Sequence, residues 1–251
     1  MLLRDQPAWI GPVRIGPVRI GPARIGIVLY DGVEPIDLGG TLGVISMASR
    51  LLPGLSATTI AEHAGPVRCA GGLTVLAAHG FADVAGWAPL GASPEARLGT
   101  PPGDATRDAT CDVVVVAGGP GWAAQSRNPA MLAFLRGLDP ARLASVCTGA
   151  LILGAAGLLE GCRATTRRTA IGAETEAPLA LLAAMGAAAT AAQIVDAGGP
   201  VTGGGVSLAH DLTLHLIGRL YGEAARDEVA RLIEYDRAFA ANRAALGIVV
   251  D

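Results

Sequence analysis

The sequence contains no lysine and few aromatic residues, and these scarcities already restrict what it can build. All 19 basic residues are arginine, and Phe, Trp and Tyr together make up 4% of the chain. The core must therefore consist mainly of Ala, Leu, Val and Ile. The net charge is −3, and the basic residues form no stripe in the folded region. The composition thus gives no reason to expect a nucleic-acid partner.

The chain also lacks a long hydrophobic run. No stretch of 18 or more apolar residues is free of glycine and charge, so we expect no transmembrane helix and no membrane partner. The N-terminus is no secretory signal, because arginines recur through its apolar part. With 251 residues, 51% of them hydrophobic, the chain suits one globular domain with appendages. We expect a cytoplasmic protein.

Cysteine pairs and metal-binding patterns are missing as well. The four cysteines form no CxxC pair, and no Cys/His cluster has zinc-ligand spacing; they are Cys69, Cys111, Cys147 and Cys162. We expect four reduced thiols. Two of the four histidines, His210 and His215, lie five residues apart and do not share a helix face well. We therefore predict no catalytic metal and no cofactor.

Two segments stand apart from the folded pattern. Residues 10–26 repeat a five-residue unit, IGPVR-IGPVR-IGPAR-IG, in which Pro and Gly recur too often for a helix or a central strand. We expect residues 1–24 to form a disordered or loosely extended tail. Residues 84–110 are rich in Pro, Gly, Ala and Thr without a steady period, which indicates a loop insertion. The domain itself is expected over 25–251.

From Ile25 onward, apolar runs of strand length alternate with helical segments. The expected strands are 25–30, 57–62, 73–77, 111–117 and 143–146, with a hairpin at 193–196 and 201–202. The expected helices are 37–50, 129–138, 150–159, 177–185, 208–221 and 224–235. This alternation predicts an α/β fold with a mainly parallel sheet covered on both faces. Ligands of such sheets bind outside the carboxyl ends of the strands.

The turn around Cys147 is the strongest candidate for chemistry. A short strand meets Val146-Cys147-Thr148-Gly149, and an apolar helix follows. A residue at such a corner projects from a sharp turn. The helix N-terminus favours the thiolate and lowers the pKa of the thiol. The alternative is a buried, inert cysteine at a strand end. Among the four cysteines, only Cys147 is expected to combine a helix N-terminus with solvent access.

Two further turns end at the same edge of the predicted sheet. In the first, Gly118 and Gly119 begin a GGPG turn, whose backbone N–H groups could stabilise an anion beside Cys147. On its own, this pattern indicates only a turn. The second contains Glu34 and Asp37, either of which could cap the next helix. A carboxylate that faces a thiolate could instead share or relay a proton.

These residues carry a resemblance to the DJ-1/PfpI superfamily. The matching segments are YDGVEPIDL (30–38), VVVVAGGPG (113–121), ASVCTGA (144–150), residues 151–166 and VTGGGV (201–206). The sequence is most similar to the isonitrile hydratase branch and to the amidase-like domains of AraC-type regulators. The resemblance implies a flavodoxin-like three-layer sandwich, class I glutamine amidotransferase-like, that is usually a homodimer.

The resemblance also implies roles for individual residues. Cys147 corresponds to the nucleophile, and Asp37 to the acidic residue that hydrogen-bonds it. Thr148, Gly118 and Gly119 correspond to residues that face the substrate. Gly204, in a turn near the site, is expected to contribute to substrate binding as well.

The chain also departs from the family pattern. Many relatives carry a histidine after a threonine pair, whereas this sequence has Arg167 after Thr165 and Thr166. This weakens any reading that needs a Cys–His pair, and an arginine there could favour an anionic group. Because the sequence ends at Asp251, soon after the last predicted helix, we expect an enzyme without the DNA-reading domain of the AraC-type regulators.

The sequence therefore favours hydration of an isonitrile to an N-substituted formamide, with a small-molecule substrate and no cofactor. Two alternatives remain. One is a glyoxalase or deglycase-type cysteine enzyme that acts on reactive carbonyls. The other is a non-catalytic ligand-binding or redox-sensing module in which Cys147 is oxidised.

Overall fold

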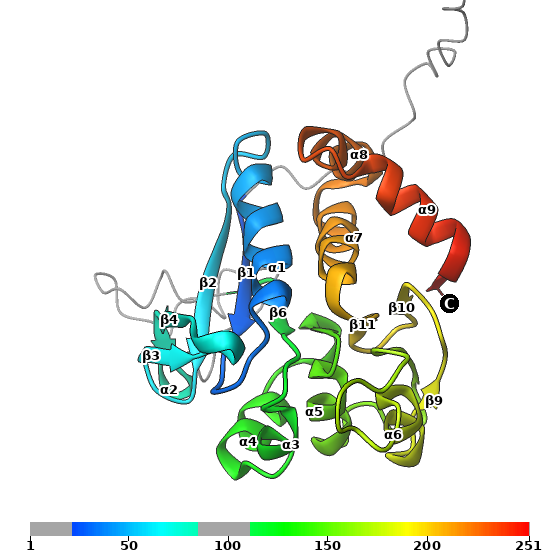
Figure 1. Cartoon of the computed structure of the whole chain (residues 1–251). Coiled ribbons are helices and arrows are strands. Elements are labelled where there is room, and N and C mark those ends of the chain that lie inside the picture. The colour runs from blue at the N-terminus through cyan, green and yellow to red at the C-terminus, as the bar shows by residue number, and fades with distance from the viewer. Residues whose placement is uncertain (1–21, 85–110, 251) are drawn as a thin grey trace, which may run out of the picture.

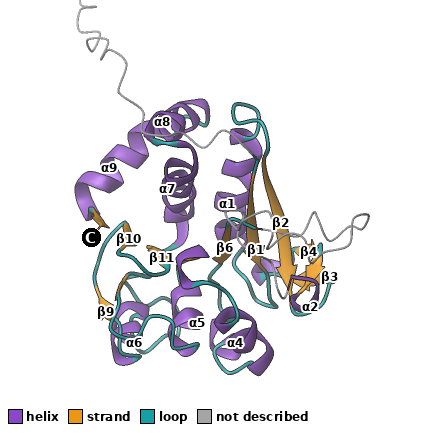
Figure 2. Cartoon of the chain, turned by 180° about the vertical axis from the view of Figure 1, so that it is seen from behind, coloured by secondary structure: helices purple, strands orange, loops and turns teal. Residues whose placement is uncertain are grey.

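The computed structural model describes residues 22–84 and 111–250. Its centre is an eight-stranded sheet (Figures 1 and 2). The strands are β1 (Ala23–Val28), β2 (Leu55–Ala61), β5 (His79–Gly80), β6 (Val113–Val116), β7 (Leu143–Val146), β10 (Ile194–Asp196), β11 (Val201–Gly203) and β12 (Ile248–Val250). Their order is β12-β10-β11-β7-β6-β1-β2-β5, and every neighbouring pair is parallel except β10 and β11.

Helices cover both faces of the sheet and complete a three-layer sandwich (Figure 1). One face carries α1 (Pro35–Ala48), α7 (Ala209–Tyr221) and α8 (Glu223–Leu232). The other carries α3 (Trp122–Gln125), α4 (Pro129–Arg136), α5 (Gly149–Ala155) and α6 (Pro178–Ala184). Helix α9 (Asp236–Leu246) follows α8 and leads to the edge strand β12.

The remaining elements are short. A hairpin of β3 (Gly65–Arg68) and β4 (Thr74–Ala77) and a pair of β8 (Arg163–Ala164) and β9 (Ala188–Ala189) lie outside the main sheet. The short helix α2 spans Phe81–Val84, and single 3₁₀ turns are η1 (Ala70–Gly72), η3 (Pro140–Arg142) and η4 (Val206–Leu208). Among these, η4 matters most, because it begins directly after the β11 turn.

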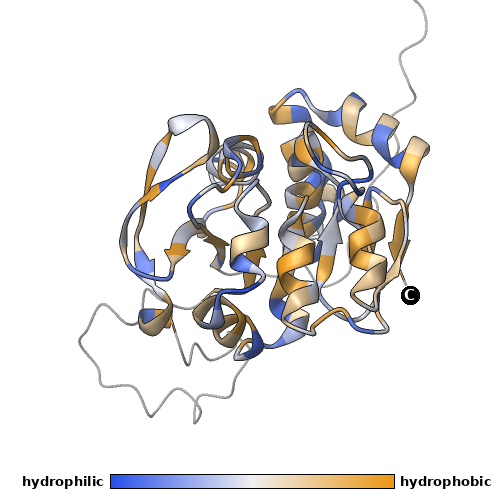
Figure 3. Ribbon diagram, turned by 60° about the horizontal axis from the view of Figure 1, so that its bottom comes forward, coloured by the Kyte–Doolittle hydropathy of each residue, from blue (hydrophilic) through white to orange (hydrophobic). Residues whose placement is uncertain are grey.

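The core is aliphatic, as the scarcity of aromatics requires. All four valines of β6 are buried, and α5 contributes Leu151, Ile152 and Leu153, each fully buried. A central parallel strand is covered on both faces, so its residues are continuously apolar. In Figure 3, by contrast, the outer helix that leads to the C-terminus alternates between hydrophilic and hydrophobic residues. Burial thus concentrates in the central strands and in the helices packed on them.

The expected α/β sandwich is confirmed, including the antiparallel hairpin of β10 and β11. Three details differ. Residues 74–77 pair with β3 in a separate hairpin instead of joining the main sheet. Helix α9 was not expected, because its sequence is only weakly apolar, and strand β12 was not expected, because it has only three residues. Strand β1 already begins at Ala23, inside the expected tail. Most of the expected tail and of the 84–110 insertion lies outside the described residues.

Candidate active site

Four neighbouring strands, β11, β7, β6 and β1, bring the predicted site residues together. The four strands are parallel, so their carboxyl ends meet at one edge of the sheet. Strand β7 runs into Cys147, β6 leads to Gly118 and β11 leads to Gly204. Strand β1 leads through a short connection to Asp37 in the first turn of α1. The topology therefore collects segments that are far apart in the sequence.

Cys147 lies in a sharp turn with an unusual backbone. Its φ angle is 54°, in the left-handed region that costs a non-glycine residue roughly 1–2 kcal/mol. Two hydrogen bonds hold this conformation. The N–H of Cys147 donates to the carbonyl of Gly204 (3.0 Å), and its own carbonyl accepts from Thr166 Oγ1 (2.5 Å). Backbone strain fixed from both sides is typical of functional turns, where it holds a side chain in place.

The sulfur of Cys147 is less accessible than the sequence suggested. The residue is only 5% exposed. Burial, and then the charge of Asp37, raise the pKa of the thiol, whereas the backbone N–H groups of Val206 and Thr148 and the charge of Arg167 lower it. The expectation of solvent access and a lowered pKa was wrong, because desolvation outweighs the helix N-terminus. The thiol therefore needs a base to remove its proton.

The acidic residue beside this thiol is Asp37. Its carboxyl group is fully buried; Oδ2 accepts a hydrogen bond from the N–H of Gly118 (2.8 Å), while Oδ1 has no partner among the described residues. Burial raises the pKa of Asp37 from 3.8 to about 7, against the Gly118 hydrogen bond, the charge of Arg167 and the Cys147 thiol, which lower it. Asp37 is not the helix cap, since Glu34 occupies that position.

Gly118 lies at the centre of the site. A Cβ atom built on it would lie 2.7 Å from Cys147 Cβ, 2.7 Å from the Thr148 nitrogen and 2.8 Å from Asp37 Oδ2. The Cys147 Cβ and the Asp37 carboxylate oxygen are therefore within about 5.5 Å of each other. Only glycine leaves room for these three groups to converge.

The N–H groups of the GGPG turn are used inside the protein. Gly118 donates to Asp37, as described, and Gly119 donates to Thr148 Oγ1 (2.9 Å). This differs from the expectation that both would present free N–H groups to an anion. The turn orients the acid and the threonine instead. The N–H groups that do face the sulfur come from Thr148 and Val206.

Gly204 also has a positioning role. It is buried, and its carbonyl holds the Cys147 backbone while its N–H donates to Gln193 (2.9 Å). Sequence reasoning placed it beside the substrate. It missed Val206, a β-branched residue with a φ of 56° that is 38% exposed. A β-branched residue in this region is a genuine outlier, but the sequence signal was only a glycine run before it.

Tyr30 is a second residue that sequence reasoning did not place in the site. It lies just beyond the end of β1, is buried, and donates a hydrogen bond to the carbonyl of Ala117 (2.8 Å). Burial, followed by the charges of Asp37 and Cys147, raises the pKa of its hydroxyl well above the usual value. Tyr30 is therefore a neutral, hydrogen-bonded neighbour of the thiol–carboxyl pair.

Arg167 stands where many relatives carry a histidine. Its side chain is 8% exposed, and Nη2 contacts Glu174 Oε1 (2.5 Å) and Oε2 (2.7 Å). Nη1 donates to the carbonyl of Thr169. The guanidinium is thus engaged by protein acceptors. Because arginine replaces histidine at this position, no imidazole from it can relay protons to Cys147 or Asp37.

The other cysteines differ from Cys147. Cys69 and Cys111 are buried, Cys162 is partly exposed, and all four thiols are unpaired. Burial raises the pKa of Cys111 to about 12. Cys162 is therefore more accessible to a reagent than the other three thiols, whereas only Cys147 lies next to Asp37 and the N–H groups of Val206 and Thr148.

In the described part of the chain, three or more His, Cys, Asp or Glu side chains do not gather into a metal-binding group. Within the same residues, the helices are too short or too polar to cross a membrane.

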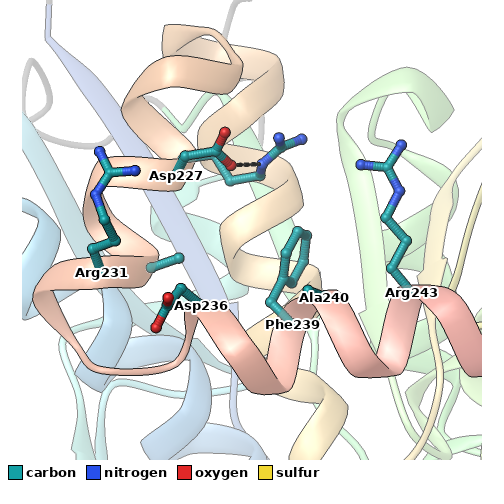
Figure 4. A pocket seen from close by; sticks show the side chains of 8 residues that line it. Asp227, Arg231, Asp236, Phe239, Ala240 and Arg243 are labelled. Atoms are coloured by element: carbon teal, nitrogen blue, oxygen red, sulfur yellow. Dashed lines mark hydrogen bonds and ion pairs between the residues drawn. The ribbon is translucent and has the colours of Figure 1, made fainter. Parts of the chain in front are cut away.

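A groove of about 330 Å³ lies between α8 and α9 (Figure 4). Its lining includes Arg226, Arg231, Phe239 and Arg243. The residues predicted for the site do not line it, so this groove is separate from Cys147.

The sequence is similar to two known proteins. The chain is 34% identical over 142 residues to an uncharacterised protein encoded in the cpoL 5′ region of Streptomyces lividans, covering 56% of this chain and 84% of that protein. It is 36% identical over 126 residues to the isonitrile hydratase of Pseudomonas putida, covering 49% of this chain and 52% of that enzyme. The second match therefore spans about half of the hydratase.

Solved structures show the same fold. A THiJ/PfpI family protein from Pseudomonas syringae superposes with a TM-score of 0.63 at 27% identity, covering 90% of this chain and 82% of that one. An AraC family transcriptional regulator from Pseudomonas putida gives a TM-score of 0.60 at 19% identity, covering 84% and 100%. The DJ-1/PfpI family profile matches residues 23–219, from the first strand into α7. The chain belongs to the DJ-1/PfpI family.

Proposed function

We propose that the protein is an isonitrile hydratase-like enzyme that converts R–NC and water into an N-substituted formamide. The observation that carries this proposal is the convergence of a strained cysteine and a buried carboxyl group on Gly118. A pKa of about 7 suits Asp37 to both accept and donate a proton near neutrality. The partial identity to an isonitrile hydratase supports this choice of substrate.

The first half of the reaction forms a bond between sulfur and carbon. The Cys147 sulfur attacks the terminal carbon of the isonitrile while ionised Asp37 removes the thiol proton. Asp37 then delivers this proton to the same carbon, which gives a thioimidate, R–N=CH–S–Cys147. The unpartnered Asp37 Oδ1 is the free acceptor for the moving proton. The N–H groups of Val206 and Thr148 stabilise the charge on sulfur.

The second half consumes water. Water adds to the thioimidate carbon, with one proton passing through Asp37 to the nitrogen. The tetrahedral intermediate R–NH–CH(OH)–S–Cys147 then collapses, the C–S bond breaks, and the hydroxyl proton returns to sulfur. The products are R–NH–CHO and the free thiol, so the atoms balance and no oxidant or cofactor enters.

A side-by-side assay separates this proposal from a carbonyl-directed activity. Purified protein and its Cys147→Ala variant receive either a simple alkyl isonitrile or methylglyoxal, and chromatography follows formamide and lactate. We expect formamide from the wild type alone and no lactate. Lactate formation without formamide would favour the glyoxalase alternative, and neither product would favour a non-catalytic module.

We further propose that the protein is cytoplasmic, as its unpaired cysteines suggest, and that it is a homodimer, as the resemblance implies. Sedimentation of the full chain should give twice the mass of 25.2 kDa. A monomer at micromolar concentration would contradict this part of the proposal.

A further inference from the structure

Arg167 is a buried charge beside the site that the proposed reaction does not use. Its guanidinium is committed to Glu174 and to the carbonyl of Thr169. Glu174 is in turn fixed by the N–H of Ile171, which donates to Oε2 (2.9 Å). An arginine held in this way is not free to bind an anionic group of a substrate. Arg167 must therefore influence Cys147 through its position and its charge.

The stem of Arg167 packs against the segment that holds Cys147. A Cβ atom built on Gly205 would lie 2.7 Å from both Cβ and Cγ of Arg167, so the arginine stem lies directly on this glycine. Gly205 is flanked by Gly204, whose carbonyl binds the Cys147 N–H, and by Val206, whose N–H faces the sulfur. Arg167 therefore supports the turn that positions the Gly204 carbonyl and the Val206 N–H.

The residue before Arg167 contacts Cys147 directly. Thr166 is fully buried and donates its hydroxyl to the Cys147 carbonyl. Arg167 is thus tied to the cysteine from two directions, through Thr166 along the chain and through Gly205 by packing. A change in the position of Arg167 would therefore alter the position of the Cys147 sulfur through Thr166 and through Gly205.

Charged and titratable groups face Cys147 from several elements. Asp37 of α1 raises the pKa of the thiol, and the Cys147 charge in turn acts on Tyr30 beyond β1. Arg167 lowers the pKa of the thiol and that of Asp37. Since Asp37 repels a thiolate, the arginine partly offsets this repulsion.

We propose that Arg167 is a positioning residue: Glu174 fixes its guanidinium, its positive charge favours the Cys147 thiolate, and its stem supports the Gly205–Val206 turn. This inference rests on the proposed role of Cys147 as the nucleophile. It also assigns a role to the position at which many relatives have histidine, a role based on charge and not on proton relay.

The test is the pH dependence of Cys147 alkylation by iodoacetamide, followed by peptide mass spectrometry in a Cys162→Ser background. Arg167→Met keeps an apolar stem and removes the charge, whereas Arg167→Lys keeps the charge. We expect Arg167→Met to raise the midpoint of the alkylation profile by roughly 1 pH unit, the lower end of the range for a nearby opposite charge. Arg167→Lys should restore most of the shift.

A matched control is available on α8. Arg226 is 7% exposed and is paired with Glu223 and Asp227, but it does not contribute to the pKa of Cys147. Arg226→Met should leave the alkylation midpoint unchanged. If Arg167→Met does not fold, Arg167→Gln provides the same comparison with a polar stem.

The inference is overturned if the charge-removing variants keep the wild-type midpoint, or if Arg167→Lys shifts it as far as they do. Either result would reduce Arg167 to a structural residue. Alkylation needs no isonitrile, so the two proposals fail separately. A shifted midpoint without formamide production rejects the reaction and supports Arg167, whereas formamide production with an unshifted midpoint rejects Arg167 alone.

Discussion

Replacing Asp37 with asparagine should separate chemistry from stability. The amide oxygen can still accept the hydrogen bond from the Gly118 N–H, and the side-chain size is preserved. Asparagine cannot take the proton of the Cys147 thiol, whose burial makes a base necessary. We expect formamide production to fall by roughly 10²-fold or more, the usual scale of general acid–base catalysis.

The same substitution should increase stability at alkaline pH. Burial raises the pKa of Asp37 to about 7, so between about pH 4 and pH 7 the folded state holds a proton that the unfolded state has lost. The Asp37 contribution to stability is thus complete below its unfolded pKa and is lost as pH rises through the folded pKa. At 1.36 kcal/mol per pKa unit, the loss is up to roughly 4 kcal/mol. Asparagine does not titrate, so the Asp37→Asn variant does not lose this stability as pH rises.

Urea denaturation of the wild type and of Asp37→Asn at about pH 4, 6 and 8 measures the difference in their free energies of unfolding. We expect the variant to gain on the wild type as pH rises, with a plateau above the pKa of Asp37. Asp139→Asn is the control, because Asp139 also accepts a backbone N–H, from Ala141 (3.0 Å), but is exposed. Near-wild-type turnover in Asp37→Asn, or a stability difference independent of pH, would refute the reasoning.

Three further changes test the geometry. Gly118→Ala should cost about 1–3 kcal/mol of stability through overpacking and sharply reduce turnover, because its Cβ would lie within 2.8 Å of three site atoms. As its control, Gly39→Ala should be neutral or slightly stabilising in the same denaturation assay, because no atom lies within 4 Å of the added Cβ. Val206→Gly should leave stability equal or higher by up to about 1–2 kcal/mol, since it removes a left-handed β-branched residue, and a lower denaturation midpoint would contradict this. Deletion of residues 1–21 should leave the melting temperature unchanged, because their Ile-Gly-Pro repeat predicts no packed layer; a drop of more than a few degrees would show otherwise.

Local sequence patterns were sufficient to predict the strand-to-turn segments of the site. The valine run before Gly118 and the short strand before Cys147 mark strand ends, and parallel strands place these ends at one edge. The partners of the turn N–H groups could not be predicted in this way. Gly118 bonds to a residue 81 positions away and Gly119 to one 29 positions away. Such contacts depend on strand order, which local patterns do not contain.

Helix α9 shows a second limit of local patterns. Its sequence, DRAFAANRAAL, buries only Phe239 in the core. A buried polar network holds it instead: Asn242 donates to Asp211 of α7, which also accepts from Tyr235 (2.9 Å) and Gln193 (2.6 Å). Tertiary hydrogen bonds of this kind leave little periodic signal in the sequence. The low accessibility of Cys147 could not be predicted from local patterns either, because Asp37 of α1 and Val206 of η4, which lie beside it, are distant in the sequence.

In the proposed reaction, Cys147 adds to an isonitrile and a formamide is released. The most direct measurement is ¹³C NMR of the purified full chain incubated with an alkyl isonitrile labelled at its terminal carbon. We expect a formyl signal that grows with the wild type at neutral pH and stays at the background rate with Cys147→Ala. A wild type that produces no formyl signal, or a Cys147→Ala variant that produces it equally fast, would contradict the account.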